Sequence, residues 1–183
     1  MGRERFMPTC TFMSRSDVLS YLPVGTAHLV SISDDHDDQA RIDERRWQSV
    51  SYHHFVDAGF DEEIIGLNGD QFEVHYADYF LASKADMLRV RLQELVSAGQ
   101  DIVINCQAGR SRSAAVAMYL NRVHGYQLDK PTPDANLCVY RMLAQDPSLL
   151  APYARATSTA EPQEPSSIAL RGWMACRRWL GLE

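Results

Sequence analysis

Residues 101–113 read DIVINCQAGRSRS, and this stretch decides the fold. Ile102, Val103 and Ile104 form a short apolar run that is typical of a buried β-strand. Residues 111–123 carry small and apolar side chains, which favours a helix, and Gly125 is placed to end it. A strand that leads through a short loop directly into a helix indicates an α/β arrangement, with Cys106 at the end of the strand.

The segments before this stretch favour the same class. Residues 26–33 and 47–56 contain the β-branched and aromatic residues that strands prefer, so two more strands are expected there. Residues 79–98 form the clearest helix, which Gly99 is placed to end. Its stripe at helical spacing consists of Met87, Leu88, Arg91, Leu92, Leu95 and Val96.

Two further elements are predicted on local signals. The pair Asn68-Gly69 lies between apolar segments within residues 62–78, which predicts a β-hairpin there. Residues 134–144 follow a turn made by Pro131 and Pro133, and they are expected to form a third helix with Asp134 as its N-cap. Helices therefore alternate with strands along the chain, as in an α/β protein.

Composition excludes several classes of function. The 183 residues carry a formal net charge of −6, which argues against binding nucleic acid or an anionic membrane through a broad basic face. No apolar run approaches the roughly 20 residues that span a bilayer, and the N-terminus lacks the apolar core of a signal peptide. The four cysteines are scattered, without the spacing of a zinc site or a disulfide framework, so a cytoplasmic, reducing setting is expected.

The chain divides into three parts. Residues 1–154 are expected to form one domain, and residues 34–46 within it are interpreted as a charged, solvated loop. Residues 155–167 are rich in Ala, Ser, Thr, Glu and Pro and are interpreted as a linker. Residues 168–183 form an apolar and basic segment, which is expected to dock on this domain or on a partner rather than on a membrane.

The loop after Cys106 has the chemistry of an anion site. Backbone N–H groups at the start of a helix have no partners within the helix, and the helix dipole attracts negative charge there. Gly109 lets the backbone turn inward, and Arg112 can hold two phosphate oxygens at once. Cysteines in such positions have pKa values of about 3.5–7.5, so the Cys106 thiolate is the expected nucleophile. Ser113 is placed to donate a hydrogen bond to the sulfur.

These residues resemble the Cys-x5-Arg-Ser/Thr signature of the protein tyrosine phosphatase superfamily, most closely its dual-specificity branch. The motif stands here as Cys106-Gln107-Ala108-Gly109-Arg110-Ser111-Arg112-Ser113, and the similarity extends over roughly residues 25–150. The resemblance implies a central, mostly parallel sheet flanked by helices, with residues 107–112 binding phosphate. It also implies hydrolysis of a phosphorylated protein or a small phosphomonoester, with no metal and no organic cofactor.

The resemblance further implies a general acid, an aspartate upstream of the cysteine. Asp57 ends the strand candidate His53-His54-Phe55-Val56 and is preferred. Asp78 also has a suitable spacing to Cys106 and remains an alternative, with Asp61 behind both.

Two features of the motif, Asn105 and Arg110, leave alternatives open. Asn105 stands where the family usually has histidine, which suggests a weak enzyme or a phosphotyrosine-binding pseudophosphatase. Arg110 adds a cation that would suit phosphoinositides, although acidic residues between 57 and 78 are expected to rim the site and repel polyanions. Phe72, Tyr76 and Tyr79 are expected to wall a pocket for phosphotyrosine. A rhodanese- or arsenate-reductase-like enzyme is a weaker hypothesis. Low-molecular-weight reductases of that type have this loop near the N-terminus, whereas here it lies in the middle of the sequence.

Overall fold

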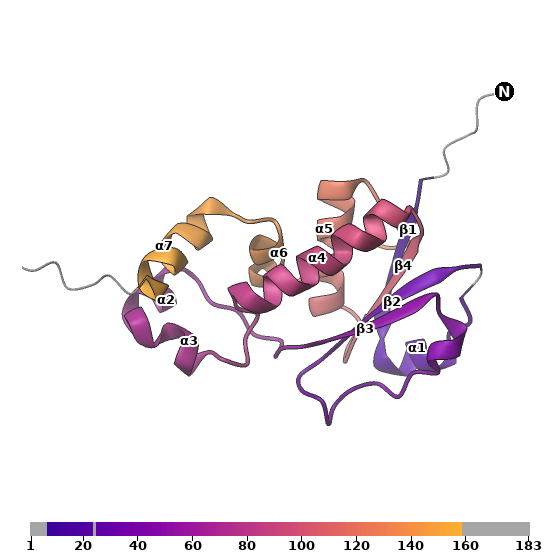
Figure 1. Ribbon diagram of the computed structural model, residues 1–183, viewed down its shortest axis with the longest axis horizontal. Coiled ribbons are helices and arrows are strands. Elements are labelled where there is room, and N and C mark those ends of the chain that lie inside the picture. The colour runs from indigo at the N-terminus through magenta and orange to yellow at the C-terminus, as the bar shows by residue number, and fades with distance from the viewer. Residues whose placement is uncertain (1–6, 24, 159–183) are drawn as a thin grey trace, which may run out of the picture.

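The computed structural model describes residues 7–23 and 25–158, which form an α/β structure around one parallel sheet (Figure 1). The sheet has five strands in the order β3-β2-β4-β1-β5, and every pairing is parallel. The strands are β1 (Thr9–Ser14), β2 (Ala27–Ser33), β3 (Ser49–His54), β4 (Asp101–Cys106) and β5 (Gln127–Leu128). The predicted α/β class and central sheet are confirmed. Within the described ranges, none of the helices has both the length and the apolar character needed to cross a bilayer.

Alternate residues of the central strands face opposite layers of helices, as the period of two in a strand requires. On one face, Ile102 and Ile104 of β4 pack in a core with α4 (Ala82–Ala98), α5 (Arg112–His124) and α6 (Leu137–Leu143). On the other face, Val103 packs with Val18 of α1 (Arg15–Ser20) in a smaller core. Both faces of β4 are therefore covered, and five of its six residues are buried.

A group of short helices lies beyond the sheet, to the left in Figure 1. It comprises α2 (Glu62–Asn68), the 3-10 turn η2 (Gly69–Gln71), α3 (Phe72–His75) and α7 (Pro147–Thr157). The predicted hairpin at Asn68-Gly69 is wrong. Asp61 caps α2 by accepting a hydrogen bond from the Ile64 N–H at 2.9 Å, and Gly69 ends the helix with φ +53°. The Asn-Gly pair thus ends a helix instead of forming a hairpin turn. Both roles rely on the ability of glycine to adopt a positive φ.

The other predicted elements are confirmed with small shifts at their ends. The strands at 26–33 and 47–56 correspond to β2 and β3, and the helices at 79–98 and 111–123 correspond to α4 and α5. Met87, which belongs to the predicted stripe at helical spacing, is 69% exposed, whereas Leu88, Leu92 and Leu95 of that stripe are buried. The third helix begins later than expected, because Asn136 rather than Asp134 is its N-cap.

The predictions for the charged loop and for the C-terminal part of the chain have different outcomes. Residues 34–46 form the expected loop, with one 3-10 turn, η1 (Glu44–Arg46). Helix α7 continues to Thr157, so the first three residues of the predicted linker 155–167 are helical. Ser158 is the C-cap of α7, and residues 159–167 of that linker, like the C-terminal segment 168–183, lie outside the described residues.

Candidate active site

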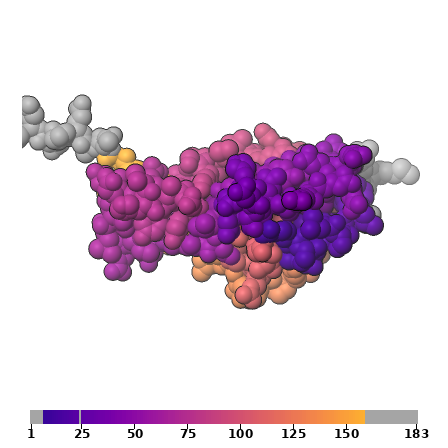
Figure 2. All heavy atoms as spheres, turned by 90° about the horizontal axis from the view of Figure 1, so that it is seen from below, coloured from indigo at the N-terminus to yellow at the C-terminus, as the bar shows by residue number. Residues whose placement is uncertain are grey.

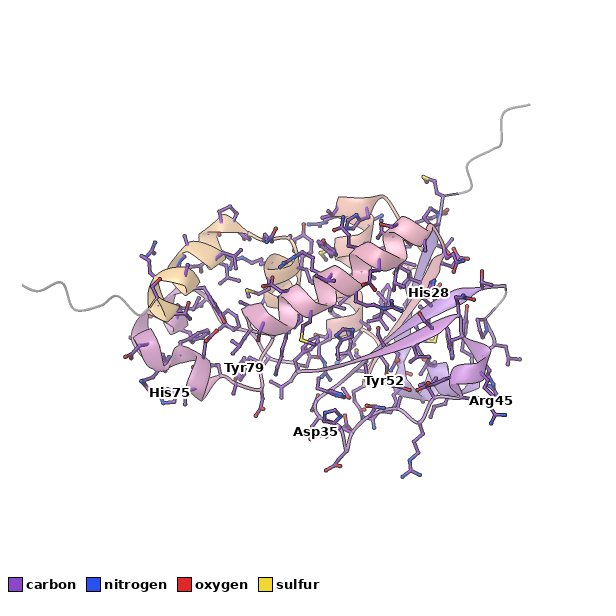
Figure 3. The ribbon with its side chains drawn as sticks, viewed as in Figure 1. His28, Asp35, Arg45, Tyr52, His75 and Tyr79 are labelled. Carbon is purple, nitrogen blue, oxygen red and sulfur yellow. The ribbon has the colours of Figure 1, made fainter. Side chains whose placement is uncertain are left out.

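Parallel pairing brings the carboxyl ends of four strands to one edge of the sheet. Ser14, the last residue of β1, is the register partner of Cys106, the last residue of β4. Asp34 follows β2 and Phe55 follows β3 at the same edge. Figure 3 labels Asp35, the residue after Asp34, at the bottom of the view. Figure 2 shows the molecule from that side, where N-terminal segments adjoin segments of the C-terminal half. Ligands of open parallel sheets bind at such an edge.

Cys106 and Ser113 are brought together as predicted. The Cys106 Sγ lies 3.2 Å from the Ser113 Oγ, within hydrogen-bonding distance, and the two residues are 1% and 0% exposed. The thiol is therefore shielded from solvent and lies next to the first turn of α5. Burial raises the pKa of the thiols of Cys10 and Cys138, which have no comparable loop around them. Among the described cysteines, Cys106 alone stands at a strand end facing a helix N-terminus.

The loop from Gln107 to Ser111 leaves its backbone donors free. Within the part of the chain that the structure describes, none of these five N–H groups donates a hydrogen bond to a protein atom. Ser111 is the N-cap of α5, yet its side chain makes no capping hydrogen bond. Because unpartnered N–H groups at a helix start attract anions, residues 107–111 have the properties of a phosphate-binding loop.

Contact with β1 and α1 shapes this loop. Gly109 has φ +68°, and a Cβ on it would lie 2.2 Å from the backbone nitrogen of Ser14. The N–H of Arg15 donates to the carbonyl oxygen of Gln107 at 3.3 Å. The loop is therefore pressed against the end of β1, and only glycine fits at position 109.

Arg112 is buried at the start of α5, with 3% of its surface exposed. Its Nη1 donates to the Asp34 carboxylate at 2.5 Å and to the Phe55 carbonyl at 2.6 Å. Its Nε has no hydrogen-bond partner among the described residues and lies 3.9 Å from Asp57 Oδ2. The guanidinium is thus fixed by the ends of β2 and β3, and it retains a donor with no protein acceptor.

Of the three candidate acids, Asp57 is the one that contacts the loop. Its Oδ1 accepts hydrogen bonds from Ser111 Oγ at 2.7 Å and from Asn136 Nδ2 at 3.0 Å. Asp61 caps α2, as described above. Asp78 is exposed and uses its backbone carbonyl to bind the Val56 N–H at 2.9 Å.

A pocket of about 480 Å³ opens beside the loop. Its lining consists of Asp57, Ala58, Gly59, Ala108, Arg110, Ser111, Asp134 and Asn136. Arg110 is exposed and lines this pocket, so the second cation of the loop is available to a ligand there. Cys106 and Arg112 are buried and do not line the pocket.

The expected aromatic wall and most of the expected acidic rim are absent from this lining. Phe72 packs edge-on against Phe60 and Tyr153, and Tyr76 stacks on Phe72. Tyr79 packs against Tyr76, and Figure 3 shows it at the helical group left of the sheet. Of the acidic residues from 57 to 78, the pocket takes only Asp57. The prediction failed because residues 62–75 fold into helices that pack on α7 instead of returning to the sheet edge.

Asn105 is buried on the α1 side of the sheet, at 1% exposure. Its register partner on β2 is Ser31, and neither the Asn105 Oδ1 nor the Ser31 Oγ has a hydrogen-bond partner among the described atoms. The residue that replaces the expected histidine therefore makes no side-chain hydrogen bond to the loop.

Sequence reasoning missed one residue of the site and underrated another. Asp34 was included in a solvated loop, although its place directly after a strand was a signal that it would reach the sheet edge. Asn136 lies within residues 134–144, the segment predicted as the third helix. It caps α6, and its amide also reaches Asp57. No cluster of three or more His, Cys, Asp or Glu side chains within residues 7–23 and 25–158 is arranged to hold a metal ion.

The chain matches no protein-family model and no curated protein.

Proposed function

We propose that this protein is a cysteine-dependent phosphomonoester hydrolase with a fold of the dual-specificity phosphatase type. The observation that supports this most strongly is the loop from Gln107 to Ser111, which directly follows Cys106 and whose N–H groups donate no hydrogen bond to a described residue. A structural cysteine has no use for such a loop, whereas a phosphate group needs several donors. The Nε of Arg112 adds a further donor.

The residues divide the reaction into two steps. The Cys106 thiolate attacks phosphorus, the ester P–O bond breaks, and the leaving oxygen takes a proton from Asp57. Water then attacks the cysteinyl-phosphate, Asp57 accepts a proton from that water, and the S–P bond breaks to return the thiolate. Ser113, 3.2 Å from the sulfur, donates a hydrogen bond to the departing thiolate.

The proposed substrate is a phosphorylated side chain of a protein, phosphotyrosine first, or a small phosphomonoester. Asp57 and Asp134 line the same pocket as Arg110. Their charges oppose binding of a polyanionic lipid head group and oppose a single phosphate much less. A phosphoinositide is therefore the weaker substrate proposal.

A phosphate-binding module without turnover is the second candidate. It is favoured by Arg112, whose Nη1 is already bound to Asp34 and Phe55, and by Cys106, whose thiol is 1% exposed. The unpartnered Asn105 points the same way. Such a module would bind phosphotyrosine or vanadate at the loop and release it unchanged.

Hydrolysis of an aryl phosphate between pH 4 and 8, with a metal chelator present, separates the two candidates. We expect turnover in the wild type, loss to background in Cys106→Ser, and a loss of about 10²–10⁴-fold in Asp57→Asn. Asp61→Asn and Asp78→Asn are the matched controls and should retain activity. In Ser113→Ala the leaving group should appear in a burst, followed by slow turnover, because the intermediate accumulates.

Two results would contradict the enzyme proposal. Turnover that survives in Cys106→Ser would show that another group carries the chemistry. An inert wild type that still binds vanadate, with binding lost in Arg112→Met, would favour the binding module.

A further inference from the structure

The two oxygens of Asp57 have different surroundings. Oδ1 accepts two hydrogen bonds, from the hydroxyl of Ser111 at 2.7 Å and from the amide of Asn136 at 3.0 Å. Oδ2 accepts no hydrogen bond from a described residue and lies 3.9 Å from the Nε of Arg112. Oδ2 is therefore the oxygen on the side of the proposed phosphate site.

This asymmetry decides which oxygen can carry a proton. A proton on Oδ1 would point at groups that are already donating to that atom, so one of those hydrogen bonds would have to break. A proton on Oδ2 meets no such conflict. The two donors also prevent the carboxyl group from rotating. A protonated Asp57 is thus fixed with its O–H on the side of the leaving group.

Asn136 has no freedom to turn its amide away. Its Oδ1 accepts the Val139 N–H at 3.2 Å as the cap of α6, so its Nδ2 must face the other way. There Nδ2 donates both to Asp57 and to the carbonyl of Ala58 at 3.2 Å. The backbone N–H of Asn136 donates to the Ser111 carbonyl at 3.2 Å, which ties the start of α6 to the phosphate-binding loop.

We propose that Asn136 is a positioning residue that directs the proton of Asp57 onto Oδ2 and aims it at the leaving-group oxygen. This inference rests on the proposed phosphatase function. Asn136 does not touch the reacting atoms. It acts through Asp57, with the Ser111 hydroxyl as the second donor to the same oxygen.

Asn136→Ser isolates the amide from the helix cap. Serine is as good an N-cap as asparagine, so α6 keeps its cap, but the shorter side chain cannot reach Asp57. Asn136→Ala removes both the cap and the amide. Asp146→Ala is the control for a lost cap alone, because Asp146 caps α7 and contacts Ser148 and Arg141 instead of the site.

The readout is the dependence of kcat on the leaving group. A leaving group whose phenol has a high pKa needs a proton from the general acid. A nitrophenolate is a much weaker base and can leave without one. With phenyl phosphate we expect kcat to fall at least about 10-fold in Asn136→Ser, and with 2,4-dinitrophenyl phosphate less than about 3-fold. KM for both esters should change little. Ser111→Ala should show the same selectivity, which keeps the test valid if one variant folds poorly.

Equal losses on both esters, or no loss on either, would overturn the role of Asn136. If at the same time turnover disappears in Cys106→Ser, the phosphatase proposal stands and only this inference fails. A wild type that hydrolyses neither ester would overturn both. A selective loss in Asp146→Ala would show that helix capping, rather than the amide, produces the effect.

Discussion

Gly109 combines two constraints, a left-handed backbone and close steric contact, that no other described glycine combines. Gly109 and Gly99 have nearly the same left-handed backbone, with φ +68° and +66°. A Cβ on Gly99 would meet no atom within 4 Å, whereas a Cβ on Gly109 would lie 2.2 Å from Ser14 N. The difference between the two sites is therefore steric contact at a shared conformation.

We predict that Gly99→Ala lowers the free energy of unfolding by about 1 kcal/mol, from backbone strain alone. Gly109→Ala should cost at least about 2 kcal/mol more, since backbone atoms of β1 must move, and it should abolish vanadate binding. Urea unfolding and a vanadate titration of both variants measure this. Equal destabilisation by the two substitutions would contradict the close packing of loop against strand.

The residues predicted correctly for the site are contiguous in the sequence. Cys106, Gly109, Arg112 and Ser113 could be placed because a strand, a loop and a helix position them locally. The partners of Arg112 could not be predicted from the sequence. Asp34 lies 78 residues away, and its contact with Arg112 depends on the order of the strands in the sheet. The same holds for Asn136, which is 79 residues from Asp57.

At the scale of elements, Arg89 of α4 closes the end of α6. Its Nε donates to the Leu143 carbonyl at 3.2 Å and its Nη2 to the Met142 carbonyl at 3.0 Å. The Leu143 carbonyl lies in the last turn, where a helix leaves carbonyls without partners. The Met142 carbonyl also accepts the Gln145 N–H at 3.4 Å. The third guanidinium contact, with Asp86 at 2.5 Å, involves a carboxylate whose side chain is 66% exposed.

Arg89→Met keeps the alkyl stem and removes the donors, and it should lower the free energy of unfolding by about 1–3 kcal/mol. Asp86→Ala removes only the exposed ion pair and should cost less than about 1 kcal/mol. Thermal and urea unfolding of the two variants give the comparison. A larger loss in Asp86→Ala would show that the ion pair, not the helix end, is the important contact.

Elements with a strong local signal were predicted, and those that depend on packing were not. β2 and β4 are apolar and bounded by polar residues, whereas β1 reads Thr-Cys-Thr-Phe-Met-Ser and has no clear boundary. Helix α7 begins with Pro147 and contains Pro152, so its proline content obscured it. It is held instead by tertiary contacts, such as the 2.5 Å hydrogen bond from Tyr153 Oη to Glu73.

At the scale of the whole molecule, histidines link stability to pH. Burial, followed by the charges of His54 and Arg91, lowers the pKa of His53 to about 4. Burial also lowers the pKa values of His28, His54 and His124. Between about pH 6.5 and 4 the unfolded chain therefore binds protons that the folded protein does not. The stabilisation is complete above pH 6.5 and is lost as the pH falls.

We predict that the free energy of unfolding decreases from pH 7 to pH 4.5, and that His53→Gln reduces this decrease by about 2 kcal/mol. Urea titrations at half-unit steps of pH measure the slope. An unchanged slope in His53→Gln would mean that other groups bind the additional protons.

Strand β1 is the first strand of the sheet to be synthesised, but both of its partner strands are synthesised much later. A ribosome releases Thr9–Ser14 early, but the two neighbours of this strand in the sheet are β4 at residues 101–106 and β5 at residues 127–128. During that interval Cys10 and Phe12, buried in the finished protein, have no partner strand on either side. A growing chain with two open strand edges is prone to associate with its neighbours. Chains halted before residue 101 can pair β2 with β3 and nothing else of this sheet, so translation that stalls in the first half of the message should yield insoluble protein.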